Sequence, residues 1–96
     1  MIAIALFAII KYMNTKHGKT LKAIFDTPTR SNISFSDIES MVKAMVCKVI
    51  EREGSRLILS VAGGLWHTHR PHPSHEAKKY QVESFREFLK LRKIEP

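Results

Sequence analysis

The first half of the chain carries apolar residues at helical spacing in two stretches. In residues 16–25 the apolar side consists of Leu21, Ile24 and Phe25. In residues 37–46 it consists of Ile38, Met41, Val42 and Met45. Ser36 and Glu39 have the spacing of a capping box, in which each side chain satisfies a free backbone N–H, so we expect the second helix to begin after Ser36. The pattern predicts two amphipathic helices joined by a loop rich in turn-forming residues.

The period of the pattern changes to two in the second half of the chain. Short runs rich in β-branched residues and leucine, KVIER and RLILSVA, are separated by Glu53-Gly54-Ser55, and LWHTH follows a Gly-Gly pair. These runs predict three antiparallel strands joined in order by turns. In the second strand, alternation assigns one face to Leu57, Leu59 and Val61 and the other to Arg56, Ile58, Ser60 and Ala62. In the third strand it assigns one face to Leu65, His67 and His69 and the other to Trp66, Thr68 and Arg70.

A last amphipathic segment follows the strands. Pro71 and Pro73 end the third strand, and SHEAKK leads into a helix. Its apolar stripe consists of Val82, Phe85, Phe88 and Leu89. The order helix, helix, three strands, helix predicts an α+β domain, in which the helices pack on one face of a small three-stranded antiparallel sheet.

The first twelve residues, MIAIALFAIIKY, differ from the rest of the chain. Their apolar run is shorter than the ~20 residues that a membrane-spanning helix needs. It has no basic start and is followed by no small-x-small cleavage site, so it does not resemble a signal peptide. We therefore expect the domain to cover residues 13–96. Residues 1–12 are interpreted as an upstream start or as an element that docks on the domain or a partner, with a membrane tether as the alternative.

The excess of basic over acidic residues indicates which class of molecule the protein binds. The 96 residues include 16 Lys and Arg against 9 Asp and Glu, a net charge of +7, which favours polyanions and above all nucleic acid. The single cysteine, Cys47, excludes an internal disulfide and fits a reducing cytoplasm. Its apolar neighbours predict a small buried side chain rather than a nucleophile.

The segment GLWHTHRPHPSHEAKK holds four of the five histidines: His67, His69, His72 and His75. A zinc site normally takes three or four ligands, usually with cysteine or carboxylate among them. Because the only cysteine lies elsewhere, we predict no metal site and no cofactor. Two other interpretations stay open, an acid–base site and a solvated loop without chemistry.

Metal-free cleavage of RNA requires a base, an acid and cations that hold the phosphate. Histidine suits both proton-transfer roles near neutral pH, and His69 and His72 are the candidates for them. Arg56 and Arg70 are the candidates for stabilising the phosphate. Further phosphate contacts are expected from the basic final helix, at Lys78, Lys79 and Arg86. The alternative is a binding module that holds RNA without chemistry, with Trp66 either stacked on a base or buried in the core.

An ordered set of segments also carries a family resemblance. MNTKHGKTLKAIFDTP, SFSDIESMVKAM, EREGSR, HRPHP and KKYQVESFREFLK follow one another in residues 13–96. The set resembles the HicA family of bacterial toxin–antitoxin systems. The resemblance implies a fold similar to a double-stranded-RNA-binding domain, ribosome-independent endonuclease activity on mRNA, and a HicB antitoxin that binds and neutralises the toxin.

One position departs from the family pattern. Members usually carry a catalytic histidine directly after a Gly-Ser pair, whereas Gly54-Ser55 is followed here by Arg56. Arginine does not act as a base at neutral pH, because its pKa exceeds ~12. The leading hypothesis is therefore a HicA-type toxin in which the histidine-rich segment transfers the protons. The competing hypothesis is a degenerate toxin that binds RNA or its antitoxin without catalysis.

Overall fold

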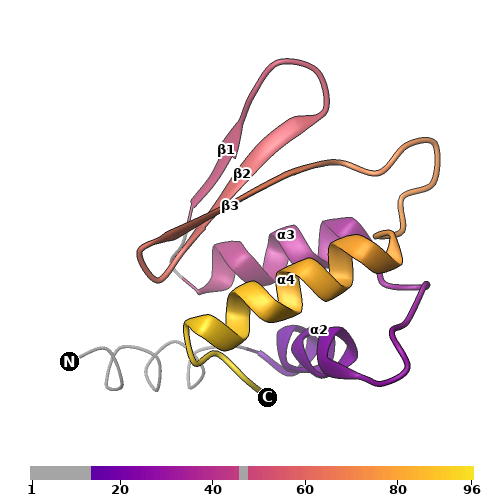
Figure 1. Ribbon diagram of the computed structural model, residues 1–96, viewed down its shortest axis with the longest axis vertical. Coiled ribbons are helices and arrows are strands. Elements are labelled where there is room, and N and C mark those ends of the chain that lie inside the picture. The colour runs from indigo at the N-terminus through magenta and orange to yellow at the C-terminus, as the bar shows by residue number, and fades with distance from the viewer. Residues whose placement is uncertain (1–13, 46–47) are drawn as a thin grey trace.

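The computed structural model describes residues 14–45 and 48–96 and confirms the α+β class and the order of elements (Figure 1). The elements are α2 (Thr15–Phe25), α3 (Phe35–Ala44), β1 (Lys48–Glu51), β2 (Arg56–Val61), β3 (Gly64–His69) and α4 (Lys79–Leu91). The predictions for residues 1–12 and for Cys47 lie outside the described residues.

The three strands form one antiparallel sheet in the order β1-β2-β3. The central strand pairs Leu59 with Val49 on one side and with Trp66 on the other. The predicted alternation in β2 is confirmed on its inner face, where Leu57, Leu59 and Val61 are at most 1% exposed. The opposite face carries Arg56 and Ile58 of β2 and their cross-strand partners His69 and His67 of β3.

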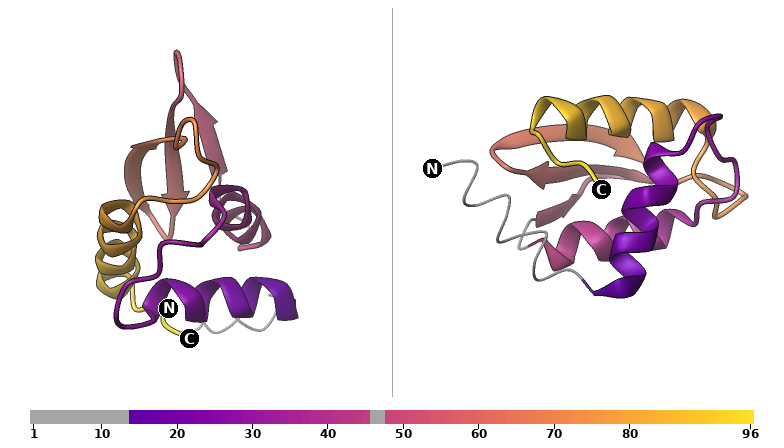
Figure 2. Two further views of the ribbon diagram at one scale, coloured as in Figure 1. Left: turned by 90° about the vertical axis from the view of Figure 1, so that its right-hand side faces the viewer. Right: turned by 90° about the horizontal axis from the view of Figure 1, so that it is seen from below.

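The helices cover one face of the sheet, as predicted. Helix α3 packs against β1 and β2, and α4 packs against β3. Helix α2 contacts α3 and α4 and crosses beneath them, on the side away from the strands (Figures 1 and 2). No helix in residues 14–45 and 48–96 covers the other face of the sheet, where Arg56, His67 and His69 are exposed.

The core lies between the sheet and the helices and includes Trp66. Its indole ring packs on Phe85, with 4.6 Å between ring centroids, and its N–H donates to the Ser84 hydroxyl at 3.0 Å. Trp66 is only 8% exposed. It is therefore a core residue, and its N–H has the partner that a buried indole needs.

The predicted capping box of α3 is wrong. The helix begins at Phe35 rather than after Ser36, and the Ser34 hydroxyl is hydrogen-bonded to the Ser36 hydroxyl instead of capping the backbone. The reason is a long-range contact, because the Phe35 N–H donates to the His75 carbonyl at 2.9 Å. A bridge between Ser34 and Glu76 continues this pairing. The start of α3 thus also holds the loop that follows β3.

One buried amide joins α4 to the end of β3. Gln81, 2% exposed, donates from Nε2 to the Thr68 hydroxyl and to the His69 carbonyl, both at 2.9 Å. Its Oε1 accepts from the Lys78 N–H at 3.0 Å. Both N–H donors of the amide and its oxygen have hydrogen-bond partners. These bonds offset the free-energy cost of burying a polar side chain in the core.

We predict that Gln81→Leu, which keeps a similar volume, lowers the free energy of unfolding by about 1–3 kcal/mol, because three partners in partly buried positions lose their hydrogen bonds. Urea unfolding followed by circular dichroism measures the change. The control is Glu87→Ala on an exposed part of the same helix, which is expected to change stability by less than about 0.5 kcal/mol. Equal effects of the two substitutions would contradict the role given to Gln81.

Candidate active site

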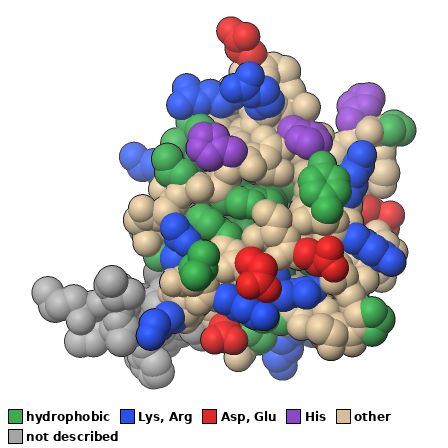
Figure 3. All heavy atoms as spheres, in the orientation of Figure 1, with side chains coloured by type: hydrophobic (Ala, Val, Ile, Leu, Met, Phe, Trp, Pro, Cys, Tyr) green, Lys and Arg blue, Asp and Glu red, His purple; other side chains and the backbone are tan. Residues whose placement is uncertain are grey.

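The open face of the sheet brings together two of the predicted catalytic residues. Arg56 on β2 is directly paired with His69 on β3, and Ile58 is paired with His67. Side chains directly opposite on neighbouring antiparallel strands have Cβ atoms about 4.5–5.5 Å apart. A guanidinium and an imidazole therefore stand next to each other on the face of the sheet that is free of helices in the described part of the chain. Figure 3 shows histidine and basic side chains gathered over the strands, with hydrophobic side chains beside them.

A hollow of about 340 Å³ lies beside this pair. It is lined by Arg52, Arg56, Leu57, Ile58, His67 and Thr68. No carboxylate is among these residues, and in residues 14–45 and 48–96 neither Arg52 nor Arg56 forms an ion pair. Both arginines are therefore free to bind an anion, with a histidine in the same hollow.

A tyrosine that the sequence analysis did not single out contacts His69. The Tyr80 hydroxyl lies 3.4 Å from His69 Nε2, and Tyr80 is 55% exposed at the start of α4. Lys78 and Lys79 precede it and are also exposed. The start of α4 thus adds an aromatic ring and a hydroxyl to the edge of the site.

His67 is the second residue that the sequence analysis left out of its catalytic set. It shares the open face with His69, and it lines the hollow with the two free arginines. The predicted partner of His69 was His72, which is exposed on the loop after β3. No hydrogen bond joins the His72 imidazole to another described residue, so its catalytic role stays a prediction.

Arg70, predicted to hold phosphate, has a structural role. It donates to Glu39 Oε1 at 2.8 Å and Oε2 at 3.3 Å, and to Glu51 Oε1 at 2.7 Å. The hydrogen bond to Glu39 is the largest cause that raises the pKa of Arg70 above its ordinary value, and the bond to Glu51 adds to it. The guanidinium therefore stays charged and bridges α3 and β1 to the end of β3.

Arg86, predicted to contact RNA, is also engaged within the fold. It donates to the Ile24 carbonyl at 2.7 Å and, from Nη2, to the Asp26 carbonyl and the Thr29 hydroxyl, both at 3.1 Å. These bonds hold the end of α2 and the loop after it against α4. Among the predicted RNA-binding residues, Arg56, Lys78 and Lys79 keep exposed side chains, whereas Arg70 and Arg86 bind other parts of the chain.

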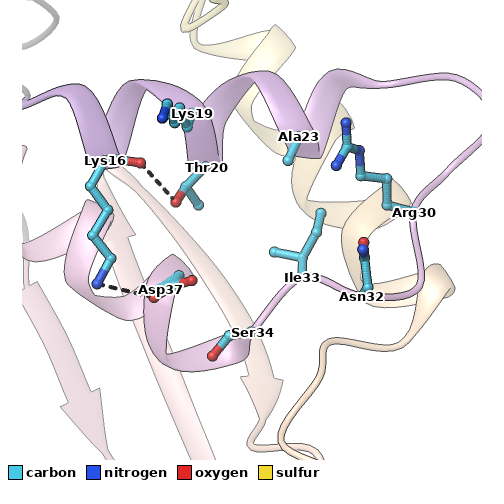
Figure 4. A pocket seen from close by; sticks show the side chains of 9 residues that line it. All are labelled: Lys16, Lys19, Thr20, Ala23, Arg30, Asn32, Ile33, Ser34 and Asp37. Atoms are coloured by element: carbon cyan, nitrogen blue, oxygen red, sulfur yellow. Dashed lines mark hydrogen bonds and ion pairs between the residues drawn. The ribbon is translucent and has the colours of Figure 1, made fainter.

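A second hollow, of about 410 Å³, lies between α2 and the start of α3 (Figure 4). Two of its cations are paired with carboxylates: Lys16 lies 3.5 Å from Asp37, and Arg30 lies 2.5 Å from Asp26. No histidine lines it. It therefore lacks both the free arginines and the proton-transfer groups that the open sheet face offers.

The described part of the chain contains no group of three His, Cys, Asp or Glu residues that could hold a metal ion. Within the same residues, no helix has the length and apolar character needed to cross a membrane. Comparisons with family models, with curated proteins and with solved structures gave no match to this chain.

We predict that Glu39→Ala lowers the free energy of unfolding by about 1–2 kcal/mol, because the Glu39 side chain is 14% exposed and accepts two charge-assisted bonds. Glu51→Ala is the matched control. Its carboxylate is 69% exposed, and exposed ion pairs contribute roughly 0–1 kcal/mol. Thermal unfolding of the two variants measures the difference, and a larger loss in Glu51→Ala would refute this ranking.

Proposed function

We propose that the protein is a metal-independent endoribonuclease and the toxin of a HicA-type toxin–antitoxin system. The observation that carries the proposal is the cross-strand pair of Arg56 and His69, beside a hollow that also holds Arg52 and His67. Two unpaired arginines favour a phosphate group. Two histidines on one open face supply the groups that acid–base chemistry on that phosphate requires.

The proposed reaction uses the 2′-hydroxyl of RNA as nucleophile. A histidine takes its proton, the 2′-oxygen bonds to phosphorus, and the bond from phosphorus to the 5′-oxygen breaks. A second histidine gives a proton to that leaving oxygen. The products are a 2′,3′-cyclic phosphate and a 5′-hydroxyl, while Arg56 and Arg52 stabilise the charge that develops on the phosphate.

His69 is one of the two proton-transfer groups in this proposal. For the second, the geometry favours His67, because it lines the hollow with both arginines. His72, which follows three residues after His69, is the other candidate. Arg56 stands where the family usually has a histidine, and it holds phosphate instead of transferring protons.

The resemblance supplies the biological part of the proposal. A HicA-type toxin cleaves mRNA independently of the ribosome in the cytoplasm and is neutralised by a HicB-like protein. Lys78 and Lys79 at the start of α4 extend the phosphate-binding surface beyond the hollow.

A second candidate function is non-catalytic binding of RNA or of an antitoxin. The observation that favours it is Leu65, which is 55% exposed on the open sheet face beside the histidines. An exposed leucine on a strand suits a protein partner better than a phosphodiester. This alternative predicts RNA retention without cleavage and expression without growth arrest.

The test is cleavage of a defined RNA by protein free of antitoxin, in the presence of EDTA. We expect fragments that end in 2′,3′-cyclic phosphate, and a loss of about 100-fold or more in rate for His69→Ala. His67→Ala and His72→Ala identify the second proton-transfer group by which of them loses a comparable factor. His75→Ala is the control, since His75 lies on the same loop but outside the hollow.

Intact RNA with the unsubstituted protein would refute the enzymatic proposal and favour the binding function. Cleavage that persists at full rate in His69→Ala would refute the proposed site. Parallel expression of the same variants in a bacterial host, with growth as the measurement, connects the biochemical loss to toxicity.

A further inference from the structure

Tyr80 contacts one ring nitrogen of His69 and leaves the other nitrogen available to a substrate. Its hydroxyl lies 3.4 Å from Nε2 of the ring, and no other described side chain forms a hydrogen bond with that imidazole. A histidine has two ring nitrogens, and the partner of one nitrogen sets the state of the other. The nitrogen left for a substrate is therefore Nδ1.

The position of Tyr80 is fixed by its neighbour in the sequence. Gln81 binds the His69 carbonyl and the Thr68 hydroxyl, so the first turn of α4 is tied to the strand that carries the histidine. Tyr80 and His69 are thus held together through the backbone as well as through their side chains. The packing of α4 on β3 therefore keeps the backbones of these two exposed residues close enough for their side chains to meet.

We propose that Tyr80 is a positioning residue that holds neutral His69 in the tautomer with its proton on Nδ1. A phenol is a good hydrogen-bond donor and a poor acceptor, whereas an unprotonated imidazole nitrogen is a good acceptor. The hydroxyl of Tyr80 therefore donates to Nε2. When the ring takes up a second proton, Nε2–H donates to the phenol oxygen, and Nδ1–H is retained.

If the proposed function holds, the contact with Tyr80 assigns different proton-transfer roles to His69 and His67. In neutral His69 the nitrogen that meets the substrate is already protonated, so the ring does not act as the base. The charged ring, with Nε2–H donating to the Tyr80 oxygen and Nδ1–H facing the substrate, acts as the acid. The Nδ1 proton of charged His69 passes to the 5′-oxygen as the bond from phosphorus to that oxygen breaks. The ring left behind keeps its proton on Nε2, and it returns to the resting state by taking a proton on Nδ1 from solvent and releasing the one on Nε2. His67, in the hollow with Arg52 and Arg56, takes the proton of the 2′-hydroxyl.

The first test is the tautomer of His69, read from ¹⁵N chemical shifts of the ring nitrogens at alkaline pH, where imidazoles are neutral. We expect the proton on Nδ1 in the unsubstituted protein. In Tyr80→Phe, which keeps the ring and removes the hydroxyl, we expect it on Nε2, the nitrogen that free histidine prefers. His67 is the internal control, because its tautomer is expected to be unchanged.

The second test is kinetic. Tyr80→Phe is expected to lower kcat by about 10-fold with KM within about twofold, as for other residues that orient a reactive group. RNA whose 5′-oxygen at the mapped cut site is replaced by sulfur needs no acid, since a thiolate leaves without a proton. On that substrate His69→Ala is expected to recover to within about tenfold of the parent, and His67→Ala to stay impaired by about 100-fold.

A His69 proton on Nε2 in the unsubstituted protein, or a tautomer that Tyr80→Phe leaves unchanged, would overturn the positioning role. Loss of the sulfur rescue in His69→Ala would overturn the assignment of His69 as the acid. If the protein cleaves no RNA, the proposed function fails by itself, and the tautomer measurement still decides the role of Tyr80.

Discussion

Two hydrogen bonds of one buried amide connect α4 to the end of β3, and a third holds the start of the helix. Gln81 lies among the apolar residues that fasten α4 to the rest of the molecule, and its amide reaches the backbone and side chain at the end of β3. An amide buried without partners costs roughly 2–7 kcal/mol, so this position is stable only when α4 and β3 keep their register. The same constraint sets Tyr80, the residue before Gln81, beside His69.

The arginines divide into those that stabilise the fold and those that remain available. Arg70 and Arg86 each use several guanidinium donors on groups of the chain itself, so neither has much to offer a ligand. Arg52 and Arg56 line the hollow on the open face, and no carboxylate pairs with them in residues 14–45 and 48–96. Positive charge on the open sheet face is therefore concentrated next to the histidines, where a phosphate can use it.

The parts of the structure that depend on local periodicity were predictable from the sequence. The period of two in RLILSVA and LWHTH gave the two faces of β2 and of β3. The register that pairs Arg56 with His69 was not predicted and is a finding of the structure. The start of α3 was not predictable, because it depends on a hydrogen bond from Phe35 to the histidine-rich loop. The roles of Arg70 and Arg86 depend in the same way on partners 31 and 62 residues away.

The role of Gln81 could have been predicted from the sequence, whereas the role of Tyr80 could not. Gln81 interrupts the apolar stripe of α4 next to Val82 and one turn before Phe85, and a polar residue in such a stripe is a signal of a buried, hydrogen-bonded group. Tyr80 gave no comparable signal, since its contact with His69 exists only once α4 is docked on β3. Periodicity predicts which residues share a face of one element. It does not predict contacts between elements that are remote in sequence, and part of the site consists of such contacts.

The most direct test of the proposed RNA site is amide and imidazole chemical-shift mapping with an RNA whose 2′-hydroxyls are methylated, which removes the nucleophile of the proposed reaction. Binding on the open sheet face predicts the largest changes at Arg52, Arg56, His67, His69 and Tyr80, with α2 unaffected. The largest changes at Lys16 and Lys19, in the hollow between α2 and α3, would contradict the assignment of the sheet face as the RNA site.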